Sequence, residues 1–164
     1  MSGAGSTPTF GAYMTLGDTQ YTPGSPFNLA AAVKTVVPNN AQMDPVNSRF
    51  NMREGAWDPV HSRFNPEFQN AVYSVRLSFL CDPGPGLPLQ RWLQASLETP
   101  SVVAVVDTRV LTQNHPAVGQ AVVFTWLVPI PTEQIVADGA KFFLFANAPL
   151  PIYNIRTAFF RVGG

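Results

Sequence analysis

The stretch Asp44-Pro45-Val46-Asn47-Ser48-Arg49-Phe50-Asn51 returns fourteen residues later as Asp58-Pro59-Val60-His61-Ser62-Arg63-Phe64-Asn65, with one change, from Asn47 to His61. In each copy the Asp side chain can accept a hydrogen bond from a backbone N–H two residues on, and Pro fixes φ at the second position of a turn. The Ser-Arg-Phe that follows alternates polar, charged and apolar side chains, which is typical of a strand with one buried face. Each copy therefore predicts a turn followed by the start of a strand, as in a structural hairpin.

The same alternation recurs along the chain between turns rich in Pro and Gly. It is clearest from Ala71 to Cys81, which predicts a long central strand with Cys81 as a small inward residue rather than a reactive thiol. Residues 132–137 form at most one helical turn. Further strands are predicted at 9–16, 27–34, 89–97, 102–111, 120–128, 141–146 and 155–162.

About nine short strands predict an all-β fold, an antiparallel β-sandwich or jelly roll. The runs at 102–111 and 120–128 are nearly continuous in apolar residues, which suits burial on both faces or a subunit interface. Residues 1–8 are small and polar and are predicted to form a flexible N-terminal arm. Residues 9–164 are then a single domain.

The composition points to a surface that other subunits cover. Of the 164 residues only 12% are charged, about half the usual share, and just two of the ten basic residues are Lys, at Lys34 and Lys141. Lys is depleted at protein–protein interfaces, and a neutral chain with few charges makes a poorly soluble monomer. The alternative is an ordinary β-protein with an Arg-leaning composition. The net charge of zero argues against binding to nucleic acid or to an anionic membrane.

The expected compartment is a cytoplasm. A lone Cys81 gives no disulfide framework, the N-terminus lacks the features of a secretory signal, and no apolar run approaches the length of a membrane span.

The region from Trp57 to Phe79 resembles the signature hairpin and following strand of the tumour-necrosis-factor/complement-q-like jelly rolls. The matching residues are Trp57, Asp58, Arg63, Phe64, Pro66, Val72, Tyr73, Val75 and Phe79. Weaker similarities lie at 27–37, at 137–145 and at Phe159-Phe160. The chain departs from the family at Ala71, where the family has Gly, and in the additional first copy at 44–51.

The resemblance implies two packed sheets with jelly-roll topology, often assembled as a trimer through the aromatic and aliphatic faces of the closing strands. The chain has no collagen-like stalk and no recognisable receptor-contact motif, so the signalling and complement functions do not carry over. Jelly rolls of this kind that are made without a signal occur in bacteriophage particles, as capsid decoration or cement proteins and as fibre or tail-tip domains.

No constellation of residues predicts catalysis, a metal or a cofactor. Asp58, His61 and Ser62 supply the residue types of a Ser-His-Asp site, but successive side chains on a strand point to opposite faces. His115 reads as a loop residue without nearby metal ligands.

Two pairs of acids, Asp44 with Asp58 and Glu54 with Glu67, would suit a glycosidase only if the fold brought them together in a cleft. The simpler interpretation is that they are solvated turn acids paired with Arg49, Arg53 and Arg63.

We therefore expect a non-enzymatic virion protein, made in the host cytoplasm, that decorates or cements a phage shell as a homotrimer. It would contact itself and a major capsid protein or another virion protein. The alternative is a receptor- or glycan-binding domain of a fibre or tail tip, which would use Trp92 with the loops at 82–88 and 114–119. The residues expected at subunit or shell contacts are Phe10, Phe50, Trp92 and Trp126. Those expected in the core of the hairpin and the following strand are Phe64, Tyr73, Val75 and Phe79.

Overall fold

The computed structural model describes residues 11–41, 48–83, 91–100, 103–111 and 119–163, and only the backbone of residues 48, 49, 54 and 103–106. Almost all of the regular structure is β, with one short 3-10 turn, η1 (Glu54–Ala56), and one helical turn and a half, α1 (Glu133–Asp138). The strands are β1 (Ala12–Gly17), β2 (Phe27–Leu29), β3 (Thr35–Val36), β4 (Ser48–Phe50), β5 (Trp57–Asp58), β6 (Arg63–Phe64), β7 (Val72–Cys81), β8 (Arg91–Glu98), β9 (Val103–Leu111), β10 (Gln120–Pro129), β11 (Ala140–Ala146) and β12 (Leu150–Gly163). The all-β prediction is confirmed.

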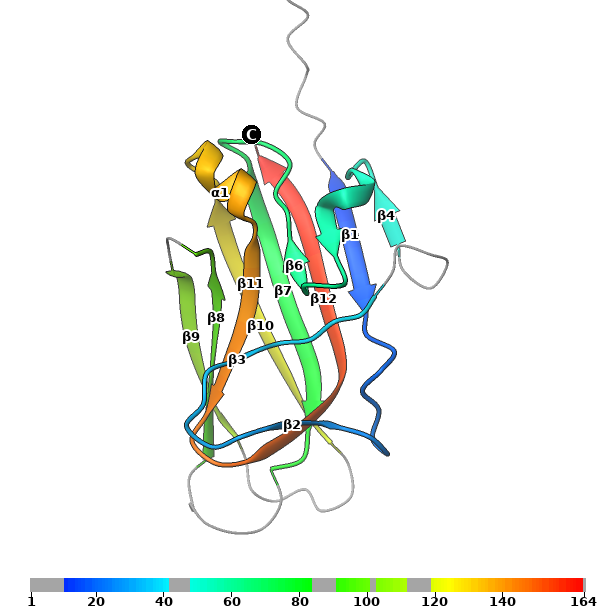
Figure 1. The fold of residues 1–164 in the computed structure, drawn as a ribbon, viewed down its shortest axis with the longest axis vertical. Coiled ribbons are helices and arrows are strands. Elements are labelled where there is room, and N and C mark those ends of the chain that lie inside the picture. Colours follow the sequence, from blue (N-terminus) through cyan, green and yellow to red (C-terminus); the bar gives the residue numbers. More distant parts are fainter. Residues whose placement is uncertain (1–10, 42–47, 84–90, 101–102, 112–118, 164) are drawn as a thin grey trace, which may run out of the picture.

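These strands form two antiparallel sheets that pack face to face (Figure 1). Sheet I has the order β10-β7-β12-β1-β4, with β2 paired to β12, and sheet II has the order β5-β6-β11-β8-β9, with β3 paired to β11. Eight strands, β1 and β6 to β12, are divided between the two sheets as β1-β12-β7-β10 and β6-β11-β8-β9, and only β8 and β9 are neighbours both in the chain and in a sheet. This order is that of a jelly roll, so the predicted topology is confirmed.

The core between the sheets is built from the inward positions of alternating strands. In β7 every second residue from Tyr73 to Cys81 is buried, as predicted. Its centre is aromatic: the ring of Phe64 stacks on Phe159 at 4.0 Å between centroids and meets Tyr73 edge to face at 5.1 Å. Pairs of packed rings contribute about 0.5–1.5 kcal/mol beyond the area they bury, so the second copy of the doubled phrase supplies a central core residue.

The predicted strand at 27–34 is wrong for most of its length. Only β2 is a strand there, and Val33 is exposed. The reason is that this segment leaves sheet I and crosses to sheet II: β2 pairs with β12, whereas β3 pairs with β11. Ala32, at φ 58°, marks the change of direction, and its N–H donates to the carbonyl oxygen of Ala146. In Figure 1 this crossing covers the end of the sandwich away from α1.

For 120–128 the sequence left two interpretations open, burial on both faces or a subunit interface, and burial on both faces does not occur within one chain. The strand β10 alternates strictly, with Val122, Phe124, Trp126 and Val128 buried and the residues between them exposed. The strand lies at the edge of sheet I, and only its inward face meets sheet II. Its outward face therefore leaves apolar side chains uncovered.

No helix in the described part of the chain is long and apolar enough to span a membrane.

Candidate functional site

The outer face of sheet I carries a row of aromatic side chains that no element in the described part of the chain covers. Register places Tyr13 of β1 opposite Phe50 of β4 on one side and Phe160 of β12 on the other. The ring centroids lie 6.0 Å apart for Tyr13 and Phe50, and 6.1 Å apart for Tyr13 and Phe160. Phe50 is 52% exposed and Phe160 40% exposed. We call these three residues the aromatic row.

Beyond the aromatic row, paired outward residues lead on to the opposite edge of sheet I. Phe160 pairs with Ser74 of β7, and Ser74 pairs with Leu127 of β10, which is 64% exposed. A band of outward residues that is apolar except at Ser74 therefore crosses sheet I from β4 to β10, and we call it the apolar band. Exposed apolar surface that is contiguous, rather than scattered, marks interaction sites in soluble proteins.

A groove lies next to this band, along β1, β7 and β12, with a volume of about 600 Å³. Two arginines line it, Arg76 of β7 and Arg156 of β12, together with Asp18 at the end of β1. A β-bulge forms one end of the groove: the register of β12 against β7 shifts between Tyr153 and Arg156, and Asn154 has φ 53°. Bulges of this kind redirect side chains and often lie beside functional sites.

A smaller cavity of about 170 Å³ lies beneath α1. It is lined by Phe64, Leu97, Thr99, Val128, Pro129, Ile130, Pro131, Ile135 and Ala140. Most of these residues belong to the core, whereas Pro129 and Pro131 are exposed.

The four residues expected in the core, Phe64, Tyr73, Val75 and Phe79, are all buried between the sheets. The four residues expected at contacts lie in different environments. Phe50 lies in the aromatic row, and Phe10 is outside the described residues. Trp126 is buried rather than on the surface, because its indole packs between Phe124 and Phe142.

Trp92 lies on the other side of the molecule, on the outer face of sheet II. It is partly exposed and its ring stacks on Phe145, with centroids 5.6 Å apart and planes inclined by 23°. The loops expected to act with it, at 82–88 and 114–119, fall mostly outside the described residues.

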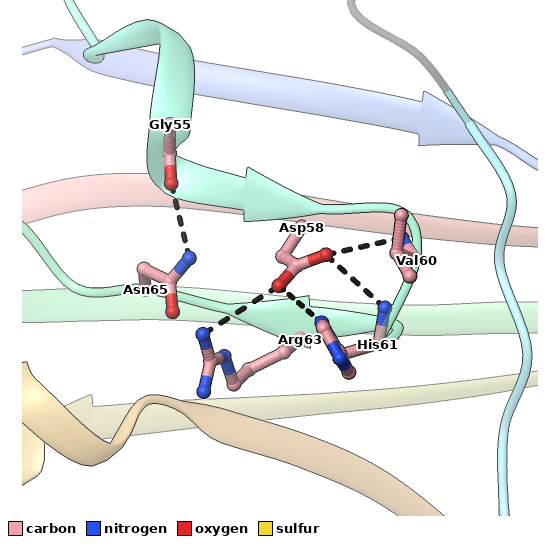
Figure 2. Close-up of polar contacts among 6 residues, drawn as sticks. All are labelled: Gly55, Asp58, Val60, His61, Arg63 and Asn65. Atoms are coloured by element: carbon pink, nitrogen blue, oxygen red, sulfur yellow. Dashed lines mark hydrogen bonds and ion pairs between the residues drawn. The ribbon is translucent and has the colours of Figure 1, made fainter.

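The second copy of the doubled phrase forms the predicted turn (Figure 2). The carboxylate of Asp58 accepts hydrogen bonds from the N–H groups of Val60 and His61, at 3.0 and 3.1 Å, and lies 2.7 Å from the His61 imidazole. Arg63 approaches it at 3.5 Å, as expected for a turn acid. Burial opposes ionisation of Asp58, but the hydrogen bonds from His61 and the charges of His61 and Arg63 outweigh it and lower the pKa of Asp58.

This turn offers no assembled nucleophile. The hydroxyl of Ser62 accepts a hydrogen bond from the N–H of Asn39 at 3.0 Å, and no contact joins it to His61. Asp58 and Arg63 therefore stabilise the turn itself, and Ser62 joins it to Asn39 in the segment that follows β3.

Glu67 corrects another expectation, since it is not a solvated turn acid. Its carboxylate is buried and accepts from the Arg161 guanidinium at 2.9 Å and from the Arg53 N–H at 2.7 Å. Its own N–H donates to the Tyr73 hydroxyl oxygen at 3.1 Å. The residue therefore joins the loop before β7 to β12. The other expected acids, Asp44 and the side chain of Glu54, lie outside the described parts.

Among the described residues no group of three His, Cys, Asp or Glu side chains could hold a metal ion.

Sequence reasoning considered a subunit interface for the run at 120–128 and for the closing strands, but it did not name Tyr13, Phe160 or Leu127 as contact residues. The available signal was an apolar residue at an outward position of the period-two pattern, such as Tyr13 between Ala12 and Met14.

No family model matches the chain, and no curated protein matches it. Among solved structures, that of Eiger TNF from S. frugiperda is similar, with a TM-score of 0.49, 6% sequence identity, and coverage of 96% of this chain and 94% of that one. The assignment of the jelly roll rests on the strand order described above.

Proposed function

We propose that this chain is a non-enzymatic structural module that assembles with copies of itself through the outer face of sheet I. The observation that carries the proposal is the apolar band from Phe50 to Leu127. On a free subunit this band exposes aromatic and aliphatic side chains across a whole sheet. In an assembly each Å² of apolar area removed from water would contribute about 25 cal/mol.

A cyclic trimer is the form we propose, with the band of each subunit facing the common axis. A sheet face about five strands wide can supply the roughly 800 Å² per partner that a stable interface of standard size buries. The low content of Lys fits a protein whose surface is largely covered.

We further propose that the assembled module belongs to a phage particle, where it decorates or cements the shell. Support comes from the neutral, sparsely charged sequence. In this arrangement sheet I serves self-association, and the remaining surface contacts a major capsid protein or another virion protein.

Light scattering coupled to size-exclusion chromatography tests the self-association. The unmodified chain should elute as a trimer, and Phe160→Ser should shift it toward monomer. Val60→Ser is the matched control, since Val60 is 84% exposed on the hairpin turn, away from the band, and should leave the mass unchanged. A stable, soluble monomer at high concentration would rule out assembly.

Mass spectrometry of purified particles tests the location. The chain should be present in stoichiometric amount, and its addition to stripped shells should raise the temperature at which they open. Its absence from particles would refute the virion role.

A second candidate function is glycan binding on sheet II, favoured by the partly exposed stack of Trp92 on Phe145. A flat aromatic surface of this kind can pack against a sugar ring. A glycan array should then show hits that Trp92→Ala abolishes, whereas an array without hits would dispose of this function.

A further inference from the structure

On the outer face of sheet I, the charged side chains at the described outward positions of β1, β7, β10 and β12 are all positive. Of the outward positions that the structure describes on β1, β7, β10 and β12, two are charged, and both are arginines, Arg76 and Arg156. No ion pair joins either of them to a carboxylate of the described residues. The other arginines of described side chains mostly pair with acids or bond to backbone carbonyls, as Arg161 does with Glu67 and Arg53 with Pro66.

The two arginines are close neighbours on adjacent antiparallel strands. Arg76 lies opposite Ala158, and Arg156 lies opposite Ser78. They are therefore diagonal partners across β7 and β12, about 7–8 Å apart at the backbone, which long side chains span easily. Like charges this close repel each other, and an anion between them removes the repulsion.

The groove contains one acid, Asp18, but its oxygens already have partners. One accepts from the N–H groups of Gln20 and Tyr21, at 2.9 and 2.8 Å, and the other from the N–H of Asn40 at 3.0 Å. Asp18 therefore closes the turn after β1, and no ion pair connects it to Arg76 or Arg156.

Uncharged polar groups complete the lining. Ser78 lies directly opposite Arg156 and two residues along β7 from Arg76, and Asn154 lines the groove at the bulge. Among the described residues no aromatic ring lines the groove, so they offer no stacking surface of the kind that neutral sugars and nucleobases use.

We propose that this groove binds a tetrahedral oxyanion, of the phosphate or sulfate class, between Arg76 and Arg156. Guanidinium groups bind such ions through paired N–H donors. Two guanidinium groups on neighbouring strands can donate hydrogen bonds to different oxygens of one ion. The site lies within one chain and does not depend on self-association. If copies do associate through the adjacent aromatic row, the bound ion also offsets the positive charge that several such faces bring together.

Isothermal titration calorimetry of the full chain with inorganic phosphate, in chloride buffer of constant ionic strength, tests the site. Saturable binding of one ion per chain is expected. Arg76→Gln and Arg156→Gln should each weaken it by at least about tenfold. Lys141→Gln removes the same charge from sheet II and should leave the affinity unchanged.

Both arginines are exposed, so the variants should unfold at the same temperature as the unmodified chain in chloride. Phe160→Ser should bind phosphate as the unmodified chain does, which separates this site from the assembly proposal. If neither the unmodified chain nor Phe160→Ser binds phosphate saturably, the inference is overturned. So would equal weakening by Lys141→Gln, because the effect would then reflect net charge alone.

Discussion

Phe50 and Phe64 occupy the same position in the two copies of the doubled phrase, yet their surroundings are opposite. Phe64 is 1% exposed and stacks on Phe159 in the core, whereas Phe50 is half exposed on the edge strand β4 and stacks on Tyr13. In the first copy β4 pairs with β1 in sheet I, and in the second copy β6 pairs with β11 in sheet II. The same eight-residue pattern therefore provides one core residue and one surface residue.

Changing each Phe to Ser should separate folding from assembly. Phe64→Ser should lower the free energy of unfolding by about 3–5 kcal/mol, because it empties a large core site. Phe50→Ser should change the stability of the dilute subunit by no more than about 1 kcal/mol and should weaken self-association. Urea unfolding and light scattering measure the two effects, and equal losses in both assays would contradict the distinction.

Cys81 should make stability depend on alkaline pH. Burial, aided by the charge of Asp82, raises the pKa of the Cys81 thiol to about 12. In the unfolded chain the thiol ionises near pH 8.5, so the unfolded state loses its proton first and stability falls as pH rises from there toward about 12. Urea unfolding should show a loss of about 1 kcal/mol between pH 8 and 9.5 that Cys81→Ala lacks. A variant with the same pH profile as the unmodified chain would refute this assignment.

The buried pair of Glu67 and Arg161 should behave as a coupled unit. Glu67→Gln should destabilise the fold by about 3–5 kcal/mol, because the guanidinium loses its carboxylate partner inside the protein. The double variant Glu67→Gln/Arg161→Met should lose less than the sum of the two single changes. Strict additivity in urea unfolding would show that the pair contributes no specific interaction.

At the scale of elements, the end of α1 packs against the hairpin of β5 and β6 at Gly139. Thr132 caps the start of α1, its hydroxyl accepting from the Ile135 N–H at 3.3 Å, and Gly139 ends the helix at φ 67° and ψ −178°. A Cβ at Gly139 would lie 2.8 Å from the carbonyl oxygen of Phe64 and equally near Arg63 and Asn65. The helix end therefore rests directly on β6.

Gly139→Ala should destabilise the fold by about 1–3 kcal/mol, since this backbone region suits glycine alone and the hairpin must also move. Gly24→Ala is the matched control, because a Cβ there meets nothing within 4 Å. Thermal unfolding compares the two variants. A Gly139→Ala protein as stable as the control would mean that the helix end can shift freely.

The segment 27–34 shows that an alternating sequence pattern does not always form a strand. Residues 27–34 alternate as well as those of β7 do, but the alternation of β7 corresponds to pairing with β10 and β12 on both sides. The 27–34 segment has partners for only a few residues before it crosses to the other sheet, so its outward apolar residues remain exposed.

At the scale of the whole molecule, assembly should appear as stability that depends on concentration. If the apolar band is buried between copies, the midpoint of thermal unfolding should rise with protein concentration, because association stabilises only the folded state. Phe160→Ser should remove this dependence, and Val60→Ser should retain it. A midpoint independent of concentration in the unmodified chain would count against assembly through this face.

The sequence by itself determined the all-β class, the long strand from Ala71 to Cys81, the hairpin at Asp58 and the short helical turn. These follow from period-two patterns and from turn residues whose preferences are local. Only the tertiary structure decided that Trp126 lies in the core, that Glu67 is buried against Arg161, and that Tyr13, Phe50 and Phe160 meet on one face. Those outcomes depend on which strands become neighbours in each sheet, and such long-range pairing brings together residues whose separation along the chain carries no periodic signal.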